Sequence, residues 1–543
     1  MRKLGSVLLV LALLTASAVG LAACGSSSSG KEGGTMTGSY ASFPDYLDPG
    51  LSYTSEGWTA LWDTYIPLLT YKHTSGPEGN EVIPGLAKSL PKITNGGKTY
   101  TLELRKGLKY SDGTPVKASD FPFAVERMFR INSGGSPFYT DIVGAEAFAE
   151  KKTSHISGIK AADKTGKIVI DLVKPRGTFT NELGLMFVAP LPQDTPIKNM
   201  TAEPPPATGP YAIIKSQPGR AWGYERNPVW ASTNGKLMPE IPSGHVDRID
   251  ITVIRNDSTQ VNETEQGKID WMQPPPPPDL LPQVKSKYEG TQLRTESTIS
   301  TYYFWMNMKR PPFDDLKVRQ AVNYALDPRA MERIYAGSIA PTQQILPPDM
   351  PGYKKFTLYP HNMGKAQQLM KEANPSDRNI TIWADNEPEN AEATQYYQDV
   401  LNKLGFSTKL KEINADNYFS IIGNENTPDL DTGWFDWYED YPHPNDYFQP
   451  LLSGESILPT NNSNFSQTDI PELNAKISRL GEETLGPKQE AEYAELDREF
   501  MEQAPWAPYG TRTLTTFVSS AIDLDKVIWN PTFEDDLTSF QFK

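Results

Sequence analysis

The sequence predicts an α/β protein with more than one domain. Two stretches combine strand and helix patterns, one before residue 172 and one from residue 302 onward. The 543-residue chain has 38% hydrophobic residues, with 11 Trp and 21 Phe, which is enough for a large core. Its single cysteine excludes a disulfide framework, and its formal charge of −15 argues against a nucleic-acid partner.

The first residues predict a lipoprotein leader. Arg2 and Lys3 precede an apolar segment at 7–14 that is too short to span a bilayer, and the motif LAAC ends at Cys24. This motif matches a lipobox, in which the cysteine becomes the lipidated first residue of the mature chain. We therefore expect residues 1–23 to be a signal peptide, Cys24 to be lipidated, and residues 24–35 to form a flexible tether.

The first half of the chain mixes strands and helices. After a turn at 48–50, apolar residues predict a helix that continues through Leu69. Alternation at 100–104 and 168–172 predicts two half-buried strands, with a helix between them. A short strand is expected between residues 211 and 225, and another within 245–254. Five consecutive prolines, 274–278, lack amide donors and predict a rigid, exposed surface loop.

The second half alternates more regularly. Residues 302–307 predict a strand, followed by a helix that Asp314 or Asp315 caps. Asp327 is expected to cap the next helix, with Pro328 in its first turn and Gly337 past its end. The remaining prediction is a loop at 343–353, a helix at 361–373, a strand at 380–384 and a helix at 391–404.

An acid-rich aromatic stretch follows at 433–452. It contains two Trp, three Tyr, two Phe and four acids, and no Lys or Arg. Aromatic faces with an acid among them suit an organic cation, and Asp440 is the candidate acid. Pro442, Pro444 and Asn445 also mark a turn-rich loop, whose aromatic residues can equally pack against a core. Composition alone supports both interpretations.

Five sequence blocks occur in one order along nearly the whole mature chain. They are VIPGLAKSL, YTLELRKGLKYSDGTPVKASDF, TGPY with ERNPVW, PPFDDLKVRQAVNYALD and ILPPDMPGY. In their order and approximate spacing, behind a lipobox, these blocks resemble the family 5 solute-binding proteins of ABC importers, the oligopeptide, dipeptide and nickel group.

The resemblance implies a periplasmic-binding-protein-like type II fold, with two lobes joined by a hinge. Lobe I would comprise residues 36–70, 201–299 and 513–543, with an extra subdomain at 71–200, and lobe II would comprise 300–512. The function implied is extracytoplasmic capture of oligopeptides or dipeptides for a membrane permease with a separate ATPase. We expect a monomer on the outer face of the cell membrane, with no enzymatic activity, cofactor, metal or nucleic-acid partner.

The resemblance also implies a site. In peptide-binding relatives, an acid in a W-x-x-D-Y-like block pairs with the peptide α-ammonium. Residues 437–442 fit this block and point to Asp440. Asp436 is the competitor, because Gly433 and Trp434 offer a second place at which the block could begin. The extra acid, Glu439, either suits a cationic ligand or faces solvent. Further candidate ligand contacts are Trp434, Trp437, Tyr438, Tyr53, Glu56, Trp58, Phe138, Tyr139, Tyr303, Trp305 and Asn307.

Two other functions are compatible with parts of the sequence. An oligosaccharide binder of the same family would use the same aromatic residues. Residues 89–92, 111–113 and 164–166 superficially match the motifs of penicillin-recognising acyl-serine enzymes, but Pro91 prevents the helix that S-x-x-K requires. The five histidines lack metal-ligand spacing, and His443 is expected at the rim of the site.

Overall fold

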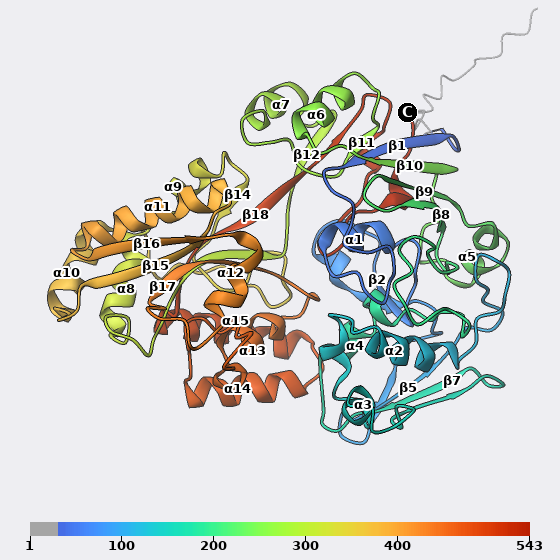
Figure 1. The fold of residues 1–543 in the computed structure, drawn as a ribbon, viewed down its shortest axis with the longest axis horizontal. Helices are drawn as coiled ribbons and strands as arrows, with labels where there is room; N and C mark the ends of the chain where they lie inside the picture. The colour runs from blue at the N-terminus through green and yellow to red at the C-terminus, as the bar shows by residue number, and fades with distance from the viewer. Residues whose placement is uncertain (1–30) are drawn as a thin grey trace, which may run out of the picture.

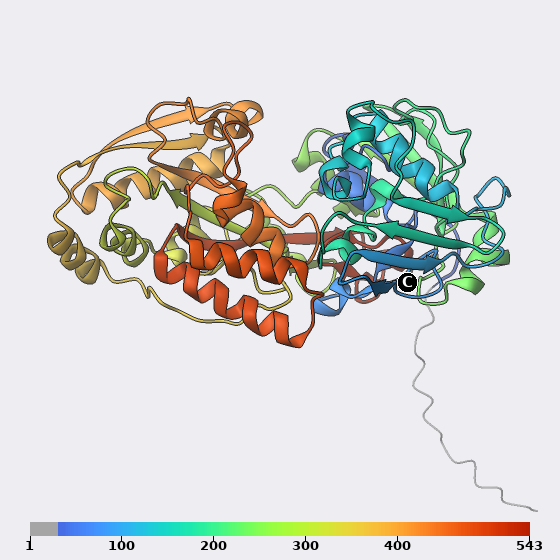
Figure 2. The same cartoon turned by 90° about the horizontal axis from the view of Figure 1, so that it is seen from below.

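The computed structural model describes residues 31–543, which form two lobes that lie side by side (Figures 1 and 2). The expected signal peptide, Cys24 and most of the tether lie outside the described residues. One hydrophobic core gathers residues from Met36 to Trp271 and from Val518 to Phe540, together with Tyr441. A second core gathers residues from Ile299 to Tyr509. We call the bodies around these cores the first lobe and the second lobe. No helix within 31–543 is long and apolar enough to cross a membrane.

A single 12-stranded sheet runs through both lobes in the order β16-β15-β17-β13-β18-β11-β1-β10-β9-β8, with β12 and β14 paired to β18. The first-lobe strands are β1 (Thr35–Tyr40), β8 (Tyr211–Gln217), β9 (Ala221–Arg226), β10 (Arg248–Val253), β11 (Trp271–Met272) and β12 (Leu293–Ser297). The second-lobe strands are β13 (Ser300–Met306), β14 (Ile339–Pro341), β15 (Asn379–Asp385), β16 (Ser407–Ile413) and β17 (Thr432–Tyr438).

Strand β18 (Trp506–Val518) joins the two lobes, as Figure 1 shows. Its first part pairs with β13 and β14, where Arg512 lies opposite Ile339. Its second part pairs with β12 and β11, beginning with Thr513 opposite Ser297. The chain also crosses between the lobes from β12 to β13. This crossing and β18 run antiparallel beside each other and link the two lobes.

An extra subdomain extends the first lobe. Its four-stranded antiparallel sheet consists of β4 (Lys92–Thr94), β5 (Thr99–Glu103), β7 (Lys167–Asp171) and β6 (Ile159–Ala162), in that order. Its helices are α2 (Asp120–Arg130), α3 (Ala145–Ala149) and α4 (Phe179–Glu182). Their apolar side chains belong to the same core cluster as the rest of the first lobe, so the subdomain packs as part of that lobe.

Helices cover the second-lobe sheet. They are α8 (Leu316–Ala325), α9 (Pro328–Ile334), α10 (Met363–Ala373), α11 (Pro388–Lys403), α12 (Ala415–Ile422), α13 (Asn445–Leu452), α14 (Pro471–Glu482) and α15 (Pro487–Gln503). The expected caps are confirmed, because Asp315 accepts from the Lys317 amide at 2.7 Å and Asp327 from the Arg329 amide at 3.0 Å.

Three local predictions were wrong. Helix α1 (Ser55–Leu61) ends before Leu69, which begins β2 (Leu69–Tyr71), because Pro67 disfavours helical backbone at the residue before it. The single strand expected near residue 211 is the hairpin β8–β9. The acid-rich aromatic stretch is strand β17, a short connection and helix α13 rather than one loop.

The motif that superficially matches S-x-x-K forms no helix. Residues 89–90 form a bend, and Lys92 begins β4. The remaining helices of the first lobe are α5 (Gly235–Leu237), α6 (Asp257–Glu265) and α7 (Leu281–Tyr288).

Candidate functional site

Three adjoining cavities lie between the two lobes. A large cavity of about 800 Å³ is lined by Glu56 and prolines 274–278 from the first lobe and by Tyr438 from the second. A small cavity of about 120 Å³ shares Tyr438 and Glu534 with it. A lateral cavity of about 560 Å³ shares Asp440 with the small cavity. Together they form what we call the interlobe cleft. The proline run is a loop, as expected, but it lines this cleft, and of its five residues only Pro278 is exposed.

Asp440 lies in the connection after β17, where the small and lateral cavities meet. The hydroxyl of Tyr53, from the segment before α1, donates a hydrogen bond of 2.8 Å to its Oδ1. Burial raises the pKa of Asp440 to about 6, and the hydrogen bond from Tyr53 acts in the opposite direction. The contact joins the lobes, so this carboxylate can bind a group that both lobes enclose.

Asp446, in the first turn of α13, holds this connection in place. Its buried Oδ2 accepts from the Asp440 amide at 2.9 Å and from the Trp437 Nε1 at 3.3 Å. Burial raises the pKa of Asp446, and the charge of Asp440 raises it further. Sequence reasoning missed this residue, although an acid in the first turn after Pro444 is a recognisable helix-start signal.

Trp437 and Tyr438 are neighbours on β17 whose side chains point to opposite faces of the sheet. Trp437 lines the lateral cavity, whereas Tyr438 lines the large and small cavities. The Tyr438 hydroxyl lies 3.1 Å from the Tyr302 hydroxyl, which also lines the large cavity. Two residues of one strand therefore supply aromatic walls to different parts of the cleft.

Asp436, the competing acid, lies on β17 directly opposite Tyr302 of β13. Burial raises its pKa to about 6, and a hydrogen bond to Tyr302 partly opposes this shift. Among the described residues that line the three cavities, Asp440 is present and Asp436 is not. Position in the structure therefore favours Asp440 as the ligand carboxylate.

Three candidates from the start of the first lobe lie at the cleft. Tyr53 is 40% exposed and lines the small cavity together with Trp58. The indole of Trp58 is fixed, because its Nε1 donates to the Ser52 carbonyl at 3.0 Å. Glu56 lines the large cavity from the first turn of α1.

Three candidates on and after β13 instead lie in the second-lobe core. Tyr303 is fully buried and stacks on Trp506 with ring centroids 3.7 Å apart. Trp305 is fully buried as well, and the Asn307 side chain donates to the Leu430 carbonyl at 2.9 Å. These positions give Tyr303, Trp305 and Asn307 packing and structural roles, and none of the three lines a cavity of the cleft.

Two further aromatic candidates are also buried. Tyr139 is fully enclosed and its hydroxyl donates to the Glu182 carbonyl at 2.6 Å. The Nε1 of Trp434 donates to the Tyr509 hydroxyl at 2.8 Å within the second lobe. Phe138, next to Tyr139, does line the lateral cavity. Of these three, only Phe138 lines a cavity of the cleft, and Tyr139 and Trp434 have packing roles.

Glu439 and His443 differ from expectation. Glu439 is half-buried and lines the small cavity, so it does not simply face solvent. His443 is fully buried rather than at the rim, and its Nδ1 accepts from the Asn445 amide at 3.1 Å. Burial lowers the pKa of His443 to about 3, so this imidazole is neutral at physiological pH.

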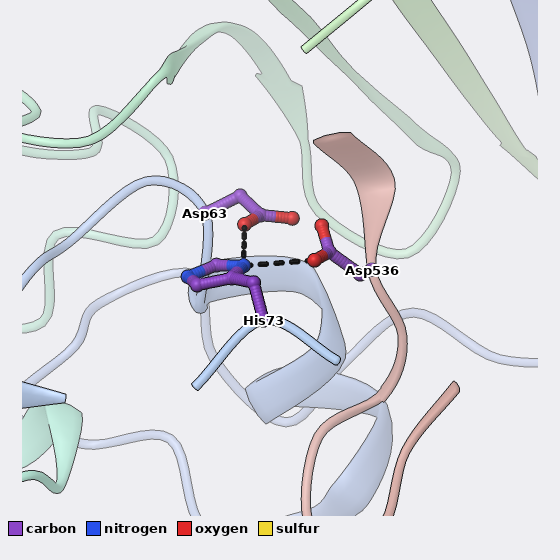
Figure 3. A group of neighbouring side chains, drawn as sticks. All are labelled: Asp63, His73 and Asp536. Atoms are coloured by element: carbon purple, nitrogen blue, oxygen red, sulfur yellow. Dashed lines mark hydrogen bonds and ion pairs between the residues drawn. The ribbon is translucent and has the colours of Figure 1, made fainter. Parts of the chain in front are cut away.

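One buried cluster has the donor set of a metal site (Figure 3). The Nδ1 of His73 lies 2.8 Å from Oδ2 of Asp536 and 3.8 Å from Oδ1 of Asp63. Among the described residues, both Asp63 oxygens lack a hydrogen-bond partner. Two carboxylates beside one imidazole can hold a divalent ion or share a proton. The ring of His73 stacks on Trp62 in the first-lobe core, away from the interlobe cleft.

Comparisons with known proteins agree with this architecture. Heme-binding protein A of Haemophilus influenzae is 26% identical over 493 residues, which cover 86% of this chain and 84% of that protein. Oligopeptide-binding protein OppA of Bacillus subtilis is 24% identical over 540 residues, 94% of each chain. The solved structure of clavulanic acid biosynthesis oligopeptide binding protein 2 superposes with a TM-score of 0.85 at 24% identity, covering 94% of this chain and 96% of that one.

The family assignment comes from a match that spans most of the chain. Residues 81–458 match the model described as bacterial extracellular solute-binding proteins, family 5 Middle. The matched region includes the extra subdomain, strands β8 to β17 and the carboxylate of Asp440. The chain therefore belongs to the family 5 bacterial extracellular solute-binding proteins.

Proposed function

We propose that this protein is a non-catalytic receptor that captures oligopeptides or dipeptides between its lobes and delivers them to a membrane permease with a separate ATPase. The observation that carries the proposal is the Asp440 carboxylate, which lies in the interlobe cleft and is contacted by Tyr53 of the opposite lobe. Relatives named as oligopeptide-binding and dipeptide-binding proteins support the same ligand class.

A carboxylate at this position can recognise a peptide amino terminus. In a closed cleft the effective dielectric is low, so an ammonium–carboxylate pair with hydrogen bonds is stronger than the same pair at an open surface. Asp440 has no Lys or Arg partner among the ion pairs of the described residues, so its charge is available to a ligand. The aromatic walls contributed by Trp437, Tyr438 and Phe138 can then accommodate side chains.

Capture would require relative motion of the lobes. The two antiparallel connections, β12 to β13 and β18, are the links about which such a motion can occur. A ligand that contacts both lobes binds the closed arrangement more tightly than the open one, and this difference in affinity drives closure.

We further propose that Cys24 carries a lipid that anchors the protein to the outer face of the cell membrane, and that the protein acts as a monomer. The lipobox and the glycine- and serine-rich segment behind it support the anchor. The family's description as extracellular and a relative named as a periplasmic protein support the location.

Ligand titration tests the proposal directly. Tryptophan fluorescence would be followed while a mixed tripeptide pool, or cello- and xylo-oligosaccharides, is added to the purified protein. Saturation by the peptides is expected, whereas saturation by a sugar without a peptide response would end the peptide interpretation.

Asp440→Asn should weaken the binding of peptides with a free amino terminus and leave the binding of N-acetylated peptides little affected. Asp436→Asn is the matched control, because it removes a nearby acid that does not line the cavities.

A further inference from the structure

The small cavity of the interlobe cleft is lined by three acids and no base. Glu439 and Asp440 reach it from the second lobe and Glu534 from the first, and its described lining includes no Lys, Arg or His. None of the three acids takes part in an ion pair between residues 31 and 543. Carboxylates withdrawn from water are costly unless they are neutralised, so this cavity favours a cationic occupant.

Glu534 is the most enclosed of these acids and is fixed in position. It is 8% exposed and lines both the small and the large cavity. Its Oε2 accepts hydrogen bonds from Gln273 Nε2 at 3.1 Å and from Thr59 Oγ1 at 3.4 Å. Its backbone is held at φ +64°, a left-handed conformation that non-glycine residues rarely adopt. These contacts hold the carboxylate in a fixed position at the cavity wall.

Aromatic rings complete the wall of the small cavity. Tyr53 and Trp58 line it from the first lobe, with ring centroids 6.1 Å apart, and Tyr438 lines it from the second. Ring faces attract ammonium and guanidinium groups, and this attraction strengthens when water is excluded. Acids and aromatic rings around one enclosed space form a recognition site for an organic cation.

The protein's own cations do not neutralise this cavity. At the large cavity, Arg512 is paired with Glu389 at 2.8 Å. At the lateral cavity, Arg176 and Lys174 are paired with Asp141 at 2.9 and 3.7 Å. Lys285, on α7, lines only the large cavity. Glu56 adds a further carboxylate beside Glu534, and burial together with Glu56 raises the pKa of Glu534 to about 8. Without a cation beside it, Glu534 is therefore mostly protonated at neutral pH, and a cationic group that enters the cavity favours its ionised form.

We propose that the small cavity is a second cation subsite, formed by Glu439 and Glu534, that selects peptides whose first residue is basic. The inference rests on the proposed function and specifies its substrate class. Asp440 also lines the small cavity. When the α-ammonium of a peptide binds Asp440, the side chain of the peptide's first residue therefore lies close to Glu439 and Glu534. At about 120 Å³ the cavity suits the end of one side chain and is too small for a peptide.

Isothermal titration calorimetry with matched peptides tests the subsite. Lys-Ala-Ala is compared with norleucine-Ala-Ala, whose first side chain is similar in length and uncharged. The wild-type protein should bind the lysine peptide about tenfold more tightly. Glu534→Gln should abolish most of this preference, as should Glu439→Gln. Glu103→Gln is the control, because it removes one negative charge from β5 of the extra subdomain, outside the three cavities, and should leave the preference intact.

Each outcome separates the subsite from the general function. Equal affinity of the wild-type protein for both peptides would overturn the subsite while leaving peptide capture in place. Binding of neither peptide would overturn the proposed function itself. If both Glu534→Gln and Glu439→Gln keep the preference for the lysine peptide, other residues cause that preference and the subsite is overturned. Binding of 1,5-diaminopentane without Lys-Ala-Ala would identify a free diamine instead of a peptide. Circular dichroism and thermal unfolding would verify that each variant is folded.

Discussion

The Tyr53 hydroxyl of the first lobe donates a 2.8 Å hydrogen bond to the Asp440 carboxylate of the second lobe. This contact spans the interlobe cleft at the point where we place the ligand's amino terminus. It stabilises the charged form of Asp440 and favours the closed arrangement of the lobes.

Tyr53→Phe should therefore weaken peptide binding by about tenfold, because it removes one hydrogen bond to a charged group. Calorimetry with a free tripeptide would measure the change. Tyr46→Phe serves as the matched control, because Tyr46 lies outside the three cavities. Unchanged affinity in Tyr53→Phe would show that the hydrogen bond is replaced when a ligand binds.

Peptide affinity should fall as pH is lowered through about 6, where Asp440 is protonated. The ammonium requires the carboxylate, and a bound ammonium stabilises that ionised form, so binding is favoured above the pKa and lost below it. From pH 7 to pH 5 the expected loss is about tenfold. Asp440→Asn should remove the step centred near pH 6, which distinguishes Asp440 from Asp446, Glu439 and Glu534 nearby.

Removing Asp446 should destabilise the site and the fold together. Asp446→Ala leaves the Asp440 amide and the Trp437 indole nitrogen without their acceptor, at a cost of about 2–4 kcal/mol in the free energy of unfolding. Asp446→Asn retains an acceptor oxygen and should cost less than half as much. Urea denaturation would compare the two variants, and similar losses in both would contradict a role based on hydrogen bonding.

The buried cluster in the first-lobe core gives a prediction on stability. His73→Ala leaves Asp63 and Asp536 facing each other without the imidazole, at a cost of about 3–5 kcal/mol. Asp63→Asn should be nearly neutral at pH 7, because burial and the charge of Asp536 raise the pKa of Asp63. A stoichiometric metal in the purified protein, with Asp63→Asn strongly destabilising, would instead show that the cluster holds an ion.

Cys24→Ser should release the protein from the membrane. Without its thiol, residue 24 cannot accept the lipid, so the protein should move from the membrane pellet to the soluble fraction on centrifugation. Immunoblotting of the two fractions measures this shift. Retention of the variant in the pellet would contradict anchoring through Cys24.

Much of the fold could be predicted because local signals agree with the tertiary structure. Asp327, Pro328 and Gly337 mark the two ends of α9 with residue types that suit those positions, and the structure confirms them. The end of α1 was mispredicted because the apolar pattern continues past Leu61 into turns and β2. Apolar periodicity does not distinguish a helix from other buried backbone.

The site was harder to predict, because residue type does not determine which way a side chain faces. Tyr303 and Tyr438 lie in aromatic strands of one sheet, yet the first packs on Trp506 and the second lines the cleft. The charge around the small cavity was also hidden, because Glu439 and Glu534 are 95 positions apart in sequence and meet only through the fold. Long-range proximity of this kind leaves no local signal.

The position of β18 bears on how the chain folds as it is synthesised. This strand lies between β13 and β11 in the middle of the sheet, yet it is the last long strand to leave the ribosome. Until residues 513–518 emerge, β12 lacks its partner strand and β11 has only one of its two neighbours, β1, whereas nearly all of the second lobe is already available. The order of synthesis therefore delays completion of the first lobe until almost the whole chain has emerged.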